Sequence, residues 1–433
     1  MSAVTVRLLL TFVLISACAP ASCGAEPAPP AAPAAPAKPA APTQRLQPAD
    51  LVYAGAFRLP DGSGDSSWEW AGDALAYHAG GDPQGPNDGC PGSLFGAGHD
   101  QQAFVTEITI PAPVVSKAKR REELPTAATL QPLRDIRGGR FGDYEMYRCG
   151  LAVLPKGPGH TTEKLFFCWG QHMQEGATEA THGWRGLNLA TGGMAGPWRV
   201  GAFNNYATCH YLLEIPKTWS DAHVPGMRLA TGRFRDGGQG GKGPSLIALA
   251  APPEDKPPAA GATLEARPLI LYGTVYEENS PTLRGYHEAD EWAGGAWLTA
   301  GQKAAVVFVG TKGLGKCWYG FANGVVWPEE GPFPPIPPAP NNDRGWWSTR
   351  FTAQMLFYDP EDLAAVAAGQ KKPHEPQPYA TLDLDPWLYA APSPQQKHRV
   401  RACTFDRERG LLYAIEFRAD DDKPLVHVWR VTP

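Results

Sequence analysis

The chain has 433 residues, of which 19% are charged and 10% aromatic, and it contains 48 Gly and 45 Pro. Its formal net charge of −5 provides no basic excess of the kind that nucleic-acid-binding proteins carry. No internal stretch approaches the roughly 18 apolar residues that a membrane-spanning helix needs. The abundance of Gly, Pro and aromatic residues favours an all-β domain with many turns.

The N-terminus has the pattern of an export signal. Arg7 precedes the apolar segment 8–16 (LLLTFVLIS), and small residues follow. The segment 15–18 (ISAC) resembles a bacterial lipobox, which predicts cleavage before Cys18 and a lipid anchor on its thiol. Ordinary cleavage a few residues later would instead release a soluble protein. We assign residues 1–24 to a signal peptide and expect either an outer-membrane or cell-surface lipoprotein, or a periplasmic or secreted protein.

Residues 25–45 form an Ala/Pro-rich linker. Such proline density is incompatible with helices and with strand pairing, and it gives an extended, semi-rigid spacer. A spacer placed after an anchor holds a domain away from a membrane. We therefore expect one folded domain over residues 46–433.

The folded domain contains a repeated cycle of strands. Five first strands, which begin with small residues, are predicted at 72–78, 149–154, 208–213, 294–299 and 402–406. Second strands follow at 93–98, 164–170, 227–232, 305–310 and 411–417. Third strands follow at 103–110, 183–189, 244–249, 351–358 and 425–431. Only four fourth strands follow their cycles, at 129–136, 198–203, 268–274 and 379–384.

The missing fourth strand is found at the other end of the chain, at 52–59 (VYAGAFRL). In a β-propeller, a strand from the opposite terminus commonly completes the last blade and removes free sheet edges. The sequence therefore predicts a single β-propeller of five four-stranded blades, closed by an N-terminal strand. The long segments 274–292 and 311–350 could hold an extra hairpin or distort one blade.

Three short patterns resemble those of uncharacterised secreted bacterial propeller proteins. They are YAGAFRLP (53–60), GHD (98–100) and FDRERGLLY (405–413). The resemblance covers most of the mature chain. It implies a fold, and no specific enzyme family or site residue comes with it.

The predicted loops differ between the two faces of the ring. Loops that join second to third strands, and fourth strands to the next blade, share one face and are long and rich in polar and aromatic residues. Rigid scaffolds commonly present binding residues on such loops. Aromatic rings stack on sugar rings while polar side chains bond the hydroxyls. We expect a substrate platform made by Arg140, Tyr206, Arg233, Trp318, Trp346 and Trp347. The alternative is that the tryptophans only pack the loops onto the ring.

This face is also rich in His, Tyr and Arg, which suits a lyase acting on uronic acids. Such an enzyme neutralises the carboxylate, abstracts the C5 proton and protonates the leaving oxygen, and the pKa values of these side chains respond to their neighbours. The expected catalytic residues are His99, Tyr144, Arg235 and His287. The protein is then an exported propeller that binds a uronic-acid-containing polysaccharide and, if it is an enzyme, cleaves it by β-elimination.

Two alternatives remain open. A glycoside hydrolase would need a pair of carboxylates, for which the candidates are Asp100, Asp143, Glu145, Asp236 and Glu288. A non-catalytic scaffold would use the same face to bind a glycan or another envelope protein. The expected partner is an extracellular ligand, with no nucleic acid, and a membrane is contacted only through the N-terminal anchor.

No cofactor is assigned, but two metal alternatives were considered from the sequence. Cys149, Cys209, His210 and Cys403 lie near predicted inner strands, where thiolate and imidazole would suit a structural zinc. Their spacing matches no established ligand pattern, so buried thiols or a disulfide bridge are the favoured explanation. The acidic run 420–422 would suit calcium, with a solvated turn as the ordinary alternative.

Overall fold

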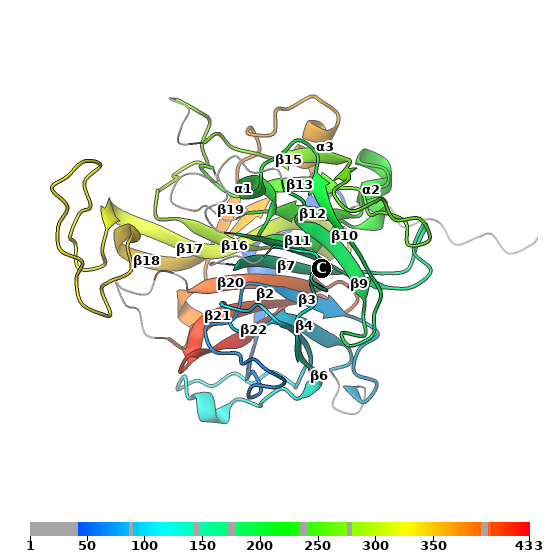
Figure 1. Cartoon of the computed structure of the whole chain (residues 1–433), viewed down its shortest axis with the longest axis horizontal. Coiled ribbons are helices and arrows are strands. Elements are labelled where there is room, and N and C mark those ends of the chain that lie inside the picture. Colours follow the sequence, from blue (N-terminus) through cyan, green and yellow to red (C-terminus); the bar gives the residue numbers. More distant parts are fainter. Residues whose placement is uncertain are drawn as a thin grey trace, which may run out of the picture. The chain divides into compact units, whose positions relative to one another are not determined.

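The computed structural model describes residues 42–85, 90–142, 147–171, 179–233, 241–274, 279–390, 397 and 399–433. The chain divides into two units, Met1–Pro39 and Ala40–Pro433, and all described residues belong to the second. Five small antiparallel sheets form a ring in this unit, which confirms the predicted five-bladed β-propeller (Figure 1). No helix among the described residues is both long and apolar enough to cross a membrane.

Each blade contains four antiparallel strands, which follow chain order in blades 1 to 4. Blade 1 contains β3 (Leu75–His78), β4 (Ser93–Ala97), β5 (Val105–Thr109) and β6 (Thr129–Arg134). Blade 2 contains β7 (Tyr147–Leu154), β8 (Lys164–Gln171), β9 (His182–Gly186) and β10 (Met194–Val200), with β14 (Thr263–Leu264) parallel to β10. Blade 3 contains β11 (Tyr211–Glu214), β12 (Leu229–Gly232), β13 (Leu246–Leu249) and β15 (Ala266–Ile270).

Blades 4 and 5 use both ends of the described chain. Blade 4 contains β16 (Glu291–Ala300), β17 (Lys303–Gly320), β18 (Gly345–Tyr358) and β19 (Ala380–Asp383), with β1 (Gln44–Arg45) parallel to β17. Blade 5 contains β20 (Val400–Asp406), β21 (Leu411–Asp420), β22 (Lys423–Val431) and the N-terminal β2 (Leu51–Arg58). The described helices are α1 (Asn205–Thr208), α2 (Lys217–His223), α3 (Pro360–Ala367) and the 3₁₀ turns η1 (Pro48–Asp50), η3 (Arg121–Glu123) and η4 (Asp385–Trp387).

The first strands of the blades are the inner ones, and each packs on the next around the axis: β3 on β7, β7 on β11, β11 on β16, β16 on β20, and β20 on β3. Small residues make this approach possible. A Cβ atom on Gly150 would lie 2.6 Å from the carbonyl oxygen of His210 in the next blade. A Cβ atom on Gly294 would lie 2.5 Å from the carbonyl oxygen of Arg401. The predicted crowding of the inner strands is therefore real.

Strand β2 closes the ring as predicted. It pairs antiparallel with β22, from Leu51 opposite Val431 to Arg58 opposite Leu425. A buried network reinforces this junction, because the Tyr53 hydroxyl bonds Nδ1 of His427 at 2.9 Å. The other ring nitrogen of His427 lies 2.8 Å from the carboxylate of Glu416 on β21. Closure thus combines a strand ladder with buried polar contacts.

Four strands, β10, β11, β17 and β18, show the main departures from the predicted ranges. β11 begins at Tyr211 instead of residue 208, because the Asn204 side chain accepts a bond from the Ala207 amide and caps the short helix α1. β10 occupies Met194–Val200 rather than 198–203. β17 and β18 continue through much of the segment 311–350, so this segment extends a hairpin of blade 4, which Figure 1 shows in yellow, reaching beyond the ring.

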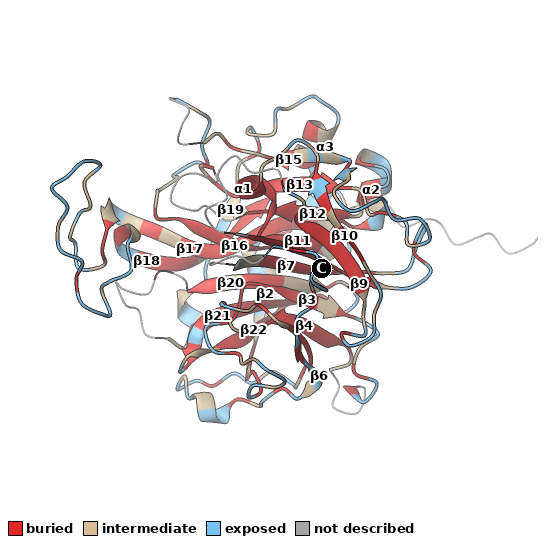
Figure 2. Cartoon of the chain, in the orientation of Figure 1, coloured by how far each residue is buried: buried red, intermediate tan, exposed pale blue. Residues whose placement is uncertain are grey.

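Buried side chains are concentrated on the strands, and exposed residues lie mostly in the loops (Figure 2). The largest hydrophobic cluster joins blades 3 and 4, where Trp297 lies 4.6 Å, centroid to centroid, from Trp219 of α2. Contacts of this kind between neighbouring blades hold the inner strands in fixed positions. The axis of the ring is therefore a rigid place to present functional side chains.

Candidate functional site

Each blade places one polar side chain at the start of its inner strand, and the five line a common cavity. These residues, which we call the axial ring, are Asp73, Arg148, His210, Glu291 and Arg401. The loops leading into them come from the fourth strands of the preceding blades. The axial ring therefore lies at the end of the axis that the sequence predicts to be the working face. Its cavity measures 20 Å³, which is room for about one water molecule.

Asp73 is the centre of the ion pairs in the axial ring. Nη1 of Arg401 donates to its Oδ1 at 2.9 Å, and Nη1 of Arg148 lies 3.9 Å from its Oδ2. Burial lowers the pKa of Arg401, and the charge of Asp73 opposes this shift. The guanidinium of Arg401 also lies over the ring of Phe417, 3.6 Å from the centroid. Two arginines from blades 2 and 5 thus converge on one carboxylate from blade 1.

His210 is the member of the axial ring without a charge at neutral pH. It is 3% exposed, and burial lowers its pKa to about 3. A neutral imidazole has one donor and one acceptor nitrogen. At neutral pH this residue can therefore exchange hydrogen bonds with a ligand, but it is not a proton donor of useful strength.

Two predicted binding residues, Tyr206 and Arg233, support the axial ring from within the protein. The guanidinium of Arg233 lies 3.9 Å from the centre of the Tyr206 ring, and both residues are 2% exposed. Arg233 contributes to the electrostatic environment that lowers the pKa of His210. Its backbone amide is held by the hydroxyl of Ser245 at 3.0 Å. The structure therefore brings these two residues together, but beneath the ring and not on an exposed platform.

The predicted residue His99 also lies near the axial ring. It follows β4, and its Nδ1 is 3.4 Å from Oδ1 of Asp100 and accepts a bond from the amide of Gln101 at 3.2 Å. Burial raises the pKa of Asp100, while the charge of Arg401 in the ring lowers it. The structure thus places a half-buried imidazole and a carboxyl group with a raised pKa beside the ring.

The other predicted residues lie elsewhere. Arg140 is exposed, on the loop between β6 and β7. Trp318, Trp346 and Trp347 belong to the extended hairpin of β17 and β18, where Trp347 is buried and pairs in register with Trp318. His287 lies in the loop that leads into β16, and its Nε2 bonds the carbonyl oxygen of Gly315 on β17. Tyr144 and Arg235 lie outside the described residues, as do the predicted hydrolase candidates Asp143, Glu145 and Asp236.

A larger cavity opens at the opposite end of the axis. It measures 410 Å³ and lies where the inner strands end, within the size range of small-molecule sites. The aromatic side chains in its wall are Tyr77, Trp297 and Phe405. Glu214 contributes a carboxylate that pairs with Arg228 at 2.5 Å. This cavity was not predicted, because the connections on that face carry no motif that sequence analysis recognises.

The zinc and calcium alternatives gain no support at their predicted positions. Cys149, Cys168, Cys209 and Cys403 are buried free thiols. Within the described part of the chain, the metal-compatible grouping of side chains is a different one, on the extended hairpin. In the acidic run, Asp420 pairs with Arg58, Asp421 with Arg121, and Asp422 with Arg418, so arginines occupy the carboxylates proposed for calcium.

Comparison of the sequence with protein-family models and with curated proteins found no match. Geometry and chemistry at the axis are therefore the basis for a functional assignment.

Proposed function

We propose that the protein binds an acidic extracellular polysaccharide whose uronate carboxylate is recognised at the axial ring. The observation that carries this proposal is the convergence of Arg148 and Arg401, from two different blades, on the axis of a rigid ring. Arginine is the residue best suited to carboxylate recognition, because its planar guanidinium offers paired donors.

The size of the axial cavity limits what part of the ligand enters it. A space of 20 Å³ accepts a hydroxyl or one oxygen of a carboxylate, and excludes a whole sugar ring. The rest of the ligand would lie across the surrounding loops, where His99 and Asp100 are accessible and Arg140 is exposed. The proposal is therefore that the axial ring recognises a uronic acid unit of a glycan, most simply the unit at the end of the glycan chain.

Cleavage by β-elimination would extend this binding role. Arg148 or Arg401 would neutralise the uronate, and His99, whose side chain is 25% exposed, is the nearest described imidazole that a ligand on the loops can reach. The hydrolase alternative is favoured by one observation, the raised pKa of Asp100, since hydrolysis requires a carboxylic acid that stays protonated. Both chemistries use the same face.

Export belongs to the same proposal, because the ligand is extracellular. Its support is the apolar segment after Arg7, the lipobox-like ISAC sequence ending at Cys18, and the Ala/Pro-rich spacer. Cell fractionation of the natural protein and of a Cys18→Ala variant tests it. Membrane association that depends on Cys18 supports the lipoprotein, and release of both forms supports ordinary secretion. Retention of the natural protein in the cytoplasm would overturn export.

A binding experiment with two variants tests the site. Natural protein, Arg148→Gln and Glu163→Gln are titrated with oligosaccharides of glucuronic, galacturonic and mannuronic acid, found first on a glycan array. Losing a hydrogen bond to a charged group costs about 1.5–3 kcal/mol, so Arg148→Gln should weaken binding by about 10- to 150-fold. Glu163→Gln, which changes the opposite cavity, should bind normally. If Glu163→Gln weakens binding and Arg148→Gln does not, the ligand binds in the opposite cavity and not at the axial ring. Binding of neutral glycans alone would refute uronate recognition.

The same oligosaccharides distinguish binding from catalysis. Ultraviolet absorbance of an unsaturated uronate product indicates a lyase, and new reducing ends without that absorbance indicate a hydrolase. Tight binding with neither product identifies a binding protein. A His99→Ala variant then shows whether the imidazole takes part, since loss of turnover with retained binding is expected only for a catalytic role.

A further inference from the structure

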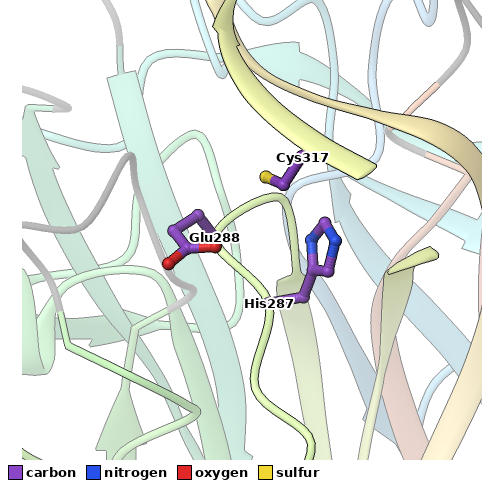
Figure 3. A group of neighbouring side chains, drawn as sticks. All are labelled: His287, Glu288 and Cys317. Carbon is purple, nitrogen blue, oxygen red and sulfur yellow. The ribbon is translucent and has the colours of Figure 1, made fainter. Parts of the chain in front are cut away.

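The extended hairpin of blade 4 brings three metal-ligating side chains together. His287 and Glu288 lie in the loop that leads into β16, and Cys317 lies on β17. One ligand atom from each residue lies within 4.8 Å of the other two, and all three residues are half-buried. Figure 3 shows the side chains directed into a common space, with one nitrogen of the imidazole facing Glu288 and Cys317.

We propose that His287, Glu288 and Cys317 bind one zinc ion through imidazole, carboxylate and thiolate, with the fourth position open to water or a ligand. Zinc–sulfur and zinc–nitrogen bonds of about 2.3 and 2.0 Å place tetrahedral ligand atoms roughly 3.5 Å apart. The observed spacing therefore requires side-chain adjustments of about 1 Å, which rotations about χ angles supply. The proposal is independent of the glycan site, because none of the three residues belongs to the axial ring.

The imidazole is already oriented for this role. Nε2 of His287 donates to the carbonyl oxygen of Gly315 at 3.1 Å, which makes Nδ1 the metal-facing nitrogen. Hydrogen bonds of this type to the second nitrogen are typical of histidine ligands in metal sites. Nδ1 also accepts a long bond of 3.4 Å from the Ala289 amide, which the zinc ion would replace. A Cβ atom on Gly313 would lie 2.7 Å from Nδ1, so the glycine keeps the space beside that nitrogen clear.

The backbone that carries the ligands is also held in place. The His287 amide donates to Oδ2 of Asp290 at 3.1 Å, and the Gly313 amide donates to Oδ1 of the same residue at 3.0 Å. Asp290 is fully buried and pairs with Lys312 at 2.8 Å. One buried carboxylate thus ties the loop that carries His287 and Glu288 to the strand that carries Cys317.

The donor set selects zinc over other common cations. Calcium and magnesium prefer sites made entirely of oxygen ligands, whereas thiolate with imidazole favours zinc. A thiolate and a carboxylate also balance the two charges of the ion. Three protein ligands with an open fourth position is the arrangement of catalytic zinc sites.

The surroundings suit a ligand-binding metal. Trp347 and Phe351 are buried in a cluster that Trp318 and Trp346 pack against, together with Cys317. An apolar environment strengthens the interaction between the ion and its ligands. Trp318 and Trp346, which the sequence predicts to contact substrate, therefore pack on the same cluster as the proposed ligand Cys317.

The test uses the full-length chain, with Cys18 and Cys23 changed to Ser in every sample to remove the N-terminal thiols. Metal-free protein is titrated with Co²⁺ and then competed with Zn²⁺. We expect one tightly bound ion per chain, a near-ultraviolet cobalt–thiolate band, and, by X-ray absorption on the zinc form, one sulfur at about 2.3 Å. Cys317→Ser should abolish the band. The variant should also bind zinc more than about 100-fold more weakly. Mutation of a residue that only hydrogen-bonds to a metal ligand already lowers metal affinity by about 10- to 100-fold, and loss of a ligand should cost more.

Matched variants make the result decisive. Cys90→Ser removes another half-buried thiol and should keep both the band and the affinity. His287→Ala should behave like Cys317→Ser, and circular dichroism of each variant checks that it is folded. Added imidazole should change the cobalt spectrum if the fourth position is open. Absence of stoichiometric binding, or unchanged binding in Cys317→Ser, would overturn the site, and an unresponsive spectrum would overturn its open position.

Discussion

Removing the closing strand should unfold the entire ring. A deletion of residues 45–60 takes away β2, including the buried side chains of Leu51, Phe57 and Leu59. Burying a Leu or Phe side chain contributes about 1.5–3 kcal/mol, so the three together contribute about 5–9 kcal/mol. The whole stability of a folded protein is about 5–15 kcal/mol. The deletion also exposes the edge of β22 and removes Arg58, the partner of the buried carboxylate of Asp420.

Thermal unfolding followed by circular dichroism and intrinsic tryptophan fluorescence measures the effect. We expect the 45–60 deletion to show no cooperative transition, or to aggregate. A deletion of residues 26–41, which removes only Ala/Pro-rich sequence, is the matched control and should melt like the natural protein. A milder variant, Phe57→Ala, should lose about 3–5 kcal/mol in urea unfolding, because this side chain fills the interface between blades 5 and 1. If the 45–60 deletion melts at the natural temperature, β2 does not close the ring.

Three further outcomes are expected. Gly150→Ala should destabilise the protein by about 1–3 kcal/mol in urea unfolding, because its Cβ would overlap the backbone of β11, whereas Gly193→Ala, with open space around it, should change stability little. Burial lowers the pKa of His182 to about 3, so between that pH and about 6.5 the unfolded chain binds a proton that the folded chain does not, and stability should fall as the pH falls. Between about pH 4.5 and 6, His182→Gln should reduce this slope by about 1.4 kcal/mol per pH unit, because the carboxylates contribute equally to both proteins. The four buried free thiols should resist alkylation in the native protein and react after unfolding, as mass spectrometry would show.

The strand repeat was predictable because most blade strands are buried along nearly their whole length and therefore appear as short apolar runs. Apolar runs separated by turn residues recur five times, and a displaced fourth strand has only one place to pair. The departures come from local interactions that periodicity does not detect. The cap that Asn204 provides for α1 shortens β11, and the extension of β17 and β18 lies in a segment whose Gly and Lys residues weaken any strand pattern.

The axial ring was harder to predict, because its members are far apart in sequence and share no residue type. His210 was predicted as a possible zinc ligand, and no sequence pattern marked Asp73, Glu291 or Arg401. A usable signal did exist. Each of the five lies within three residues of the start of a predicted first strand, so a comparison of the five cycles around the strand starts would have pointed to this end of the axis.

That placement also explains why a fivefold repeat can recognise an asymmetric ligand. The blades repeat the backbone, so equivalent positions meet at the axis with nearly the same geometry. Only the side chains differ, and here each of Asp, Arg, His, Glu and Arg faces different neighbours. Asp73 is flanked by the blades of Arg401 and Arg148, whereas Glu291 lies between His210 and Arg401. The two carboxylates are therefore not equivalent. An acidic group that reaches the axis meets Arg148 on the side where the neighbouring blade supplies a neutral imidazole, and that side is the one we expect to hold the ligand.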